Sequence, residues 1–150
     1  MLTLITGANG QLGKTIRSLV KQKKISSSFV FASRNQLDLS HLDHIQYFIE
    51  KHKFDLIINC AAYTAVDKAE VHEKEADLVN HLAVKKIAEV ALSNNIKLIH
   101  ISTDFVFDGL KHQPYFESDL TGPLNIYGNT KLAGENAVLS IMKFNAIIIR

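Results

Sequence analysis

Two residues that suit carbonyl reduction stand four positions apart in the last quarter of the chain. Tyr127 and Lys131 form a Tyr-x-x-x-Lys pattern, which places both side chains on one face of a helix. Hydride transfer to a ketone builds negative charge on its oxygen, so the site must donate a proton there. A free phenol has a pKa of roughly 10, and a neighbouring ammonium favours its ionised form. We therefore expect Tyr127 to be the proton donor and Lys131 its cationic neighbour.

Hydroxyl side chains that follow an apolar run support the same chemistry. Ser102 and Thr103 come directly after the run that begins at Ile96, and Asp104 follows them. If the run is a strand, both hydroxyls lie at its carboxyl end, where Thr103 would orient a carbonyl group by a hydrogen bond. The Tyr/Lys pair by itself also suits an amphipathic surface helix, so the interpretation depends on the whole set of residues.

A glycine-rich segment near the start of the chain has the pattern of a dinucleotide-binding loop. Gly7, Gly10 and Gly13 follow an apolar run and open a helical pattern, which is the context this motif requires. We expect Gly7 to allow a tight turn, Gly10 to let the backbone approach a pyrophosphate, and Gly13 to let the helix pack closely on the sheet. The spacing excludes an ATPase P-loop, and Lys14 does not change that conclusion.

The second apolar run indicates which dinucleotide is bound. About 20 residues after the loop, a carboxylate would bind the ribose of NAD, whereas an arginine would favour the 2′-phosphate of NADP. Arg34 stands near this point, and we therefore expect NADPH, with NADH as the alternative cofactor. Asp38 comes slightly late for the ribose role and is expected near the adenine.

Apolar runs and helical periods alternate along the chain. We expect strands at 2–6, 29–32, 55–62, 96–102 and 146–149. We expect helices at 11–23, from an N-cap at Ser40 onward, at 73–93 and at 125–143, although Gly128 and Gly134 weaken the last. The inward face of the helix at 73–93 is expected to carry Val79, Leu82, Ala83, Ile87, Val90 and Ala91. Because the strands are continuous apolar runs, both of their faces should be covered, as in a doubly wound, Rossmann-like parallel α/β sheet.

The overall composition suits one globular domain and excludes several other classes of protein. The 150 residues are 47% hydrophobic and carry 17 basic and 15 acidic side chains, which is too balanced for a nucleic-acid or membrane surface. Cys60 is the single cysteine and lies in an apolar run, so we expect a buried, inert thiol in a reducing cytoplasm. No targeting segment is visible, and no metal site is expected, because the histidines are scattered.

The motifs together resemble a known family, the dTDP-4-dehydrorhamnose reductases of the extended short-chain dehydrogenase/reductase class. The matching segments are TGANGQLG (6–13), LDLS (37–40), NCAAYTAVDKAE (59–70), HISTDFVFDG (100–109) and PLNIYGNTKLAGE (123–135). They span nearly the whole chain, and the third and fourth are far more specific than the glycine pattern. The resemblance implies NAD(P)H-dependent reduction of dTDP-4-dehydro-L-rhamnose to dTDP-L-rhamnose, with the proton supplied by Tyr127.

The resemblance also assigns further residues. It implies cofactor contacts from Gly10, Gln11, Leu12, Asp38, Leu39, Ala62, Tyr63, Thr64, Tyr127 and Lys131. Thr103 and Asp104 would touch the nucleotide-sugar substrate, and a homodimer is compatible with the resemblance. Asn80 resembles the family's structural or proton-relay asparagine, but an ordinary polar helix residue fits nearly as well.

The chain departs from the family pattern in two respects. Some members bind magnesium at a dimer interface through a glutamate soon after the third glycine, where this chain has Thr15, so no metal is carried over. Family members are also longer and place a smaller substrate domain after the point corresponding to Arg150. We therefore expect residues 1–150 to be the dinucleotide-binding domain of a longer protein and to turn over poorly alone.

Two alternative functions stay open. A non-catalytic, NADP-binding regulatory subunit of the same fold would keep the cofactor but lose turnover; the presence of Thr103, Tyr127 and Lys131 favours an enzyme. Another sugar-nucleotide epimerase or dehydratase of the same class would retain NAD tightly instead of consuming NADPH.

Overall fold

Five short apolar strands form one parallel sheet in the order β2-β1-β3-β4-β5. The computed structural model describes residues 1–150. The strands are β1 (Leu2–Thr6), β2 (Ser28–Phe31), β3 (Leu56–Asn59), β4 (Lys97–Ile101) and β5 (Ala146–Ile149). The helices are α1 (Gln11–Gln22), α2 (Leu42–Glu50), α3 (Val66–Ala69), α4 (Glu73–Asp77), α5 (Ala83–Ser93) and α6 (Ile126–Met142). Three short turns complete the chain: the π-helical η1 (Leu78–Leu82) and the 3₁₀-helical η2 (Asp104–Val106) and η3 (Lys143–Asn145).

The strand order confirms the predicted doubly wound, Rossmann-like class. The chain moves from β1 to β2 on one side and from β1 to β3 and onward on the other, so the winding direction reverses between β1 and β3. Ile5 pairs with Phe31 on one side and with Ile58 on the other, and the row continues through Ile99 to Ile147. Because all strands are parallel, their carboxyl ends meet at one edge, and a ligand crevice is expected at the reversal point.

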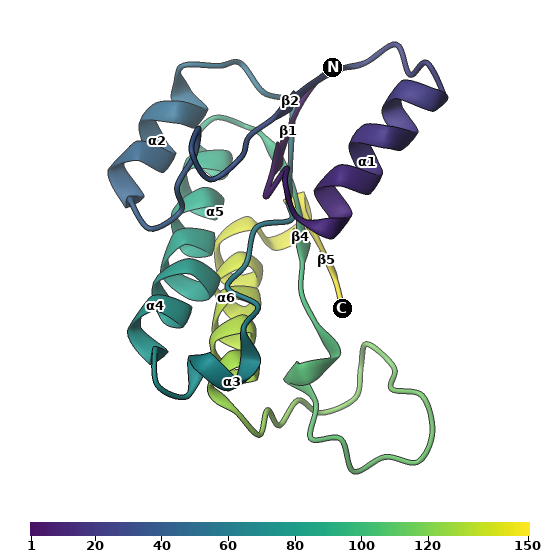
Figure 1. Cartoon of the computed structure of the whole chain (residues 1–150), viewed down its shortest axis with the longest axis vertical. Helices are drawn as coiled ribbons and strands as arrows, with labels where there is room; N and C mark the ends of the chain where they lie inside the picture. Colours follow the sequence, from purple (N-terminus) through teal and green to yellow (C-terminus); the bar gives the residue numbers. More distant parts are fainter.

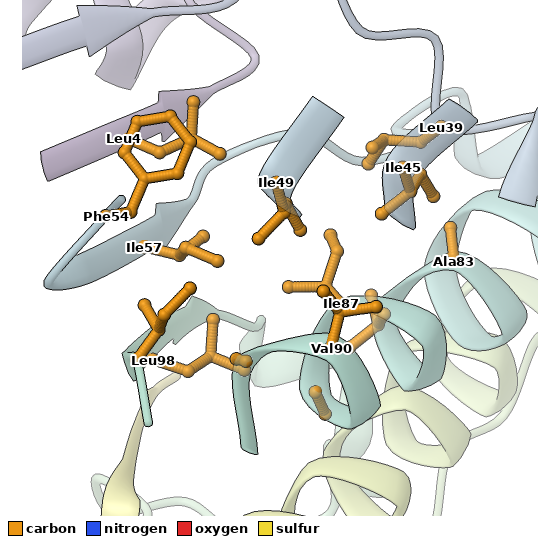
Figure 2. Packing of buried hydrophobic residues seen from close by; sticks show 14 of the residues in the cluster. Leu4, Leu39, Ile45, Ile49, Phe54, Ile57, Ala83, Ile87, Val90 and Leu98 are labelled. Atoms are coloured by element: carbon orange, nitrogen blue, oxygen red, sulfur yellow. The ribbon is translucent and has the colours of Figure 1, made fainter. Parts of the chain in front are cut away.

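The main core lies between the sheet and the helices α2 and α5. Figure 2 shows Ile45 and Ile49 of α2 facing Ile87 of α5, with Ile57 from the sheet beside them. All four side chains are fully buried, and burying an aliphatic side chain of this size contributes about 1.5–3 kcal/mol. Helix α6 packs beside α5 and extends the same layer.

The opposite face of the sheet is covered less completely than the sequence predicts. Only α1 lies on this side, and Gly13 is its single buried residue (Figure 1). Ile147 and Ile149 of β5 are 60% and 47% exposed. The apolar runs therefore identified the strands correctly, but the expectation that both faces are covered is wrong for β5.

The predicted N-cap at Ser40 is also wrong. Helix α2 begins at Leu42 with His41 as its N-cap, and no side chain caps it. The backbone nitrogen and the Oγ of Ser40 instead both donate to Oδ1 of Asp38, at 2.9 and 2.8 Å. The cap prediction did not consider that the Asp38 carboxylate, two residues earlier, can accept a hydrogen bond from the Ser40 hydroxyl.

The predicted helix at 73–93 contains a π-helical turn, η1, between α4 and α5. A π-turn inserts one residue into the helical repeat and so changes which side chains face inward. Leu82, predicted to be buried, is 37% exposed, whereas Asn80 is fully buried. None of the helices combines the length and apolar character that spanning a membrane requires.

Helix α6 continues through both of the glycines that weakened its prediction. A Cβ atom on Gly128 would collide with the carbonyl oxygen of Phe105, and one on Gly134 with the carbonyl oxygen of Asn80. These glycines therefore allow α6 to pack closely against η2 and η1.

Candidate active site

The glycine-rich loop after β1 is shaped by two close backbone approaches. Gly7 has a φ of +62°, and a Cβ atom there would lie 2.7 Å from the nitrogen of Ala61, after β3. A Cβ on Gly13 would lie 2.5 Å from the oxygen of Gly7, so this glycine lets α1 pack closely against the loop that follows β1, whereas the sequence predicts close packing on the sheet. Gly10 is the N-cap of α1, and no side chain caps the first turn. The amides and the positive end of the helix dipole are therefore available to an anion.

A cavity of about 810 Å³ opens at the reversal point of the sheet, beside this loop. It brings together ten of the predicted cofactor residues: Gly7, Gly10, Gln11, Leu12, Arg34, Asp38, Leu39, Ala62, Tyr63 and Thr64. The remaining lining residues are Asn9, Leu37, Ser40, Cys60, Ala61, Glu75, Leu78 and Val79, none of which was assigned to the site from the sequence. Most of them lie in the segment after β3 or in α4 and η1. They line the cavity only because the fold brings these separate segments together, and local sequence pattern does not show this.

The rim of the cavity carries an ion pair between Arg34 and Asp38. Nε of Arg34 lies 3.2 Å from Oδ2 of Asp38, and the arginine side chain is 81% exposed. The backbone amide of Ser40 and, to a lesser extent, the hydroxyl of Ser40 and Arg34 lower the pKa of Asp38 to about 2. Asp38 is therefore ionised at neutral pH and holds Arg34 at the cavity, where the remaining guanidinium donors can face a phosphate.

Asn80 clamps the segment that follows β3. Its Oδ1 accepts a hydrogen bond from the nitrogen of Tyr63 at 2.8 Å, and its Nδ2 donates to the oxygen of Tyr63 at 3.0 Å. Nδ2 also donates to Oγ1 of Thr130 in α6, at 3.2 Å. The buried side chain of Asn80 thus joins the cavity wall to the helix that carries Tyr127 and Lys131.

The Tyr/Lys pair lies on one face of α6, against the segment that leaves β4. Nζ of Lys131 donates to the backbone oxygen of Ile101 at 2.7 Å, and the ring of Tyr127 meets that of Phe105 edge-on, with centroids 5.5 Å apart. Both side chains are buried, Tyr127 retaining 8% exposure. Burial lowers the pKa of Lys131 to about 8, while the charge of Glu135 acts in the opposite direction.

Thr103 lies between the two residues that contact the Tyr/Lys pair. Its Oγ1 accepts a hydrogen bond from the nitrogen of Phe105 at 3.2 Å and caps η2, and it also donates to Oδ1 of the exposed Asp104 at 3.2 Å. Ser102 donates its hydroxyl to Glu135 instead. Both hydroxyls predicted at this edge therefore make hydrogen bonds within the protein, Ser102 to the buried Glu135 and Thr103 to the exposed Asp104.

Tyr63 connects the cavity with the Tyr/Lys pair. It lines the cavity and also packs on the small apolar cluster of Ala69, Ala76 and Tyr127. Gly13, Thr103, Asp104, Tyr127 and Lys131 do not line the cavity themselves. The structure thus places the glycine-rich loop and the Tyr/Lys pair at the carboxyl edge of the sheet, joined through Tyr63.

The RmlD substrate binding domain family model matches residues 1–150. The chain belongs to this family. Among curated relatives, a dTDP-4-keto-6-deoxy-D-glucose reductase from Streptomyces niveus is 39% identical over 98% of this chain and 50% of its own length. A dTDP-4-dehydrorhamnose reductase from Escherichia coli (strain K12) is 39% identical over 92% of this chain and 46% of its own length.

Solved structures of dTDP-4-dehydrorhamnose reductases match as well. The one from Clostridium acetobutylicum ATCC 824 has a TM-score of 0.94 and 39% identity, and the match covers 100% of this chain and 52% of that one. The one from Bacillus anthracis str. Ames, in complex with NADP, has a TM-score of 0.91 and 34% identity, covering 99% and 52%. The resemblance inferred from the motifs is confirmed, and the chain spans about half the length of these relatives.

Cys60 is more exposed than the sequence of this RmlD-family chain predicts. Cys60 is only partly buried and lines the cavity, whereas the sequence predicts a buried thiol. Burial still raises its pKa to about 11, so the thiol is protonated and poorly nucleophilic at neutral pH. The structure brings together no group of three His, Cys, Asp or Glu side chains suited to a metal ion, and Thr15 donates its hydroxyl to the backbone of Gln11.

Proposed function

We propose that this protein reduces dTDP-4-dehydro-L-rhamnose to dTDP-L-rhamnose with NADPH, in the biosynthesis of dTDP-rhamnose. The observation that carries the proposal is the placement of Tyr127 and Lys131 on one face of α6, against the Ile101–Phe105 segment and next to the glycine-loop cavity. The names of the dTDP-4-dehydrorhamnose reductases among the relatives support the substrate and the reaction, and that of the Streptomyces niveus relative supports reduction of a dTDP-4-keto sugar.

The residues of the cavity fit a dinucleotide. The uncapped start of α1 and the loop at Gly10 suit the pyrophosphate, and Arg34 at the rim suits a 2′-phosphate. Ala62, Tyr63 and Thr64 would hold the part of the cofactor that extends toward α6. When bound there, the reduced nicotinamide supplies the hydride. We assign residues 1–150 as the dinucleotide-binding unit. NADH is the alternative cofactor.

The chain itself supplies the proton and the orientation of the substrate. Tyr127 donates its phenolic proton to the carbonyl oxygen as negative charge develops there. The Lys131 ammonium, fixed by the oxygen of Ile101, stabilises the phenolate that remains. The Thr103 hydroxyl, which donates to Asp104 in this structure, turns to donate to the same carbonyl oxygen when substrate binds, and the exposed Asp104 contacts the sugar nucleotide. The single cysteine forms no disulfide, which suits a reaction in the reducing cytoplasm.

Replacing the tyrosine tests the assigned reaction. In the protein expressed from its complete reading frame, Tyr127→Phe should lower kcat for NADPH oxidation with dTDP-4-dehydro-L-rhamnose by about 10²–10⁴-fold. Tyr47→Phe, the same change on an exposed tyrosine of α2, should have no effect. Equal rates for Tyr127→Phe and the wild type would contradict the proposal, as would a wild type that binds NADPH without consuming it.

The choice of cofactor is tested separately at the rim of the cavity. Arg34→Ala should weaken NADPH binding and leave NADH binding nearly unchanged, because only NADPH carries the 2′-phosphate. Arg17→Ala, at an exposed arginine of α1, is the matched control. Titration by nicotinamide fluorescence measures both affinities, and equal losses for the two cofactors would show that Arg34 does not bind the phosphate.

A further inference from the structure

Helix α6 carries a fully buried carboxylate one turn beyond Lys131. Glu135 has no exposed surface. Nε of Arg150 donates to both carboxylate oxygens of Glu135 at 3.1 Å, and Nη2 of Arg150 donates to Oε2 at 2.7 Å. The Oγ of Ser102 donates to Oε1 as well. A charge buried this deeply is tolerated because its lone pairs are satisfied, and here the donors come from two other segments of the chain.

The partners of Glu135 lead directly to the proposed active site. Ser102 immediately precedes Thr103, so its bond to Glu135 fixes the start of the segment that presents the Thr103 hydroxyl. Arg150 extends the connection, because its Nη1 donates to the backbone oxygen of Glu117 at 3.1 Å and its guanidinium lies 5.1 Å from the ring centroid of Phe107. A single carboxylate on α6 thus ties down the chain after β4, the end of β5 and the loop between them.

Glu135 also shares a helix face with Lys131, four residues earlier. The lysine ammonium is bonded to the oxygen of Ile101, in a region from which water is excluded. Tyr127 stands four residues earlier on α6, His100 of β4 feels the charge of Lys131, and Arg150 reaches this region through Glu135. Burial and the charge of Lys131 lower the pKa of His100 to about 3, so it is neutral at working pH. The negative charge that opposes the desolvation of Lys131 therefore comes from Glu135.

We propose that Glu135 is a positioning residue for carbonyl reduction: it anchors the Ser102–Thr103 corner to α6 and supplies the negative charge beside the Lys131 ammonium. The catalytic part of this inference rests on the proposed function. Its electrostatic part depends only on the fold, and the two are tested by different measurements.

The electrostatic part is tested by titrating Lys131 directly. Nuclear magnetic resonance of the complete protein, with carbon-labelled lysine, follows the Cε signal of Lys131, which Lys131→Arg identifies by its loss. Glu135→Gln should move the titration midpoint of Lys131 to lower pH by about one unit, since an opposite charge has been removed. Glu89→Gln, the same change on an exposed side chain of α5, should leave the midpoint where it is. Equal midpoints in Glu135→Gln and the wild type would overturn the proposal.

The catalytic part is tested by the pH profile of NADPH-dependent reduction. Glu135→Gln should shift the alkaline fall in kcat to lower pH, whereas Ser102→Ala should lower kcat several-fold without shifting the profile. A lower kcat for Glu135→Gln with an unshifted profile would reduce Glu135 to a structural role. If the wild type does not consume NADPH with the dehydro-sugar, the proposed function fails, while the lysine titration still decides the electrostatic part.

Glu135→Gln leaves Arg150, whose side chain is 21% exposed, without its anionic partner, and this can prevent folding. The double variant Glu135→Gln/Arg150→Met removes both charges together, so neither is left unpaired. It should show the same direction of shift for Lys131 as the single variant. An unshifted midpoint in the double variant would overturn the proposal.

Discussion

Mild acid should destabilise the fold through one buried imidazole. His100 of β4 is fully buried, and its Nδ1 lies 3.1 Å from Nδ2 of Asn59. Oδ1 of Asn59 accepts a hydrogen bond from Thr6 at 2.6 Å, so the amide group of Asn59 faces the imidazole as a donor and Nδ1 must be unprotonated. Nε2 has no partner in the protein. Burial, with a smaller contribution from the charge of Lys131, lowers the pKa of His100 to about 3.

The sign and the size of the effect follow from this pKa. The unfolded chain takes up a proton at His100 near the ordinary pKa of about 6.5, well before the folded chain does. The contribution of the neutral imidazole to the free energy of unfolding is therefore fully present above about pH 6.5 and is lost as the pH falls toward 3. Each pH unit in this window changes the free energy of unfolding by about 1.4 kcal/mol. Between about pH 7 and about pH 5, the expected loss is about 2 kcal/mol.

Urea unfolding at a series of pH values, followed by circular dichroism, measures this loss. His100→Asn retains an acceptor for Asn59 but cannot titrate, so its stability should vary with pH by about 2 kcal/mol less than that of the wild type over the same range. The variant should be less stable throughout, because a smaller side chain leaves a cavity. His112→Asn, at an exposed position, is the matched control. Identical pH dependence in His100→Asn and the wild type would refute the reasoning.

Three further predictions concern the contacts around the cavity. Gly134→Ala should destabilise the protein by about 1–3 kcal/mol and lower its melting temperature, because the added Cβ would collide with the oxygen of Asn80. Calorimetry measures the melting temperature, and an unchanged value would contradict the predicted collision. Asn80→Ala should weaken NADPH binding more than Asn80→Asp, because aspartate can still accept from the nitrogen of Tyr63; equal affinities by fluorescence titration would argue against the clamp. Asp38→Asn should be less stable than the wild type at neutral pH, because Ser40 donates its hydrogen bonds to the ionised carboxylate of Asp38. The difference in the free energy of unfolding should vanish as the pH falls from about 4 through about 2 and the carboxylate becomes protonated; a difference that stays constant with pH in urea unfolding would exclude the carboxylate as its cause.

The sequence predicted the features that depend on local pattern. Continuous runs such as Leu2–Thr6 and Ala146–Ile149 are strands with the predicted bounds, because a short apolar run bounded by polar or turn residues favours a strand. The glycine spacing predicted the loop at the end of β1, because the positive φ of Gly7 and the close backbone approach at Gly13 both exclude a side chain. The exposed isoleucines of β5 show the limit of this reasoning, because an apolar run does not reveal what covers it.

Other features depend on contacts between distant segments and could not be predicted from local pattern. Ser40 was assigned a capping role that it does not have, because the choice between the helix and Asp38 depends on the turn between them. Glu135 was not singled out at all, although its place four residues after Lys131 was a usable signal. Its importance comes from Ser102 and Arg150, which the strand order brings to the same helix.

The wide helical turn at Leu78–Leu82 makes the number of residues in this part of the chain as important as their identity. Loss of one residue there would restore a regular repeat and rotate everything before it by about 100° relative to everything after it. Ala76 and Asn80 would then no longer point toward α6, and the wall of the cavity would lose its support. We therefore expect related proteins to keep the same number of residues in this turn, even where they differ in the residues on its exposed side.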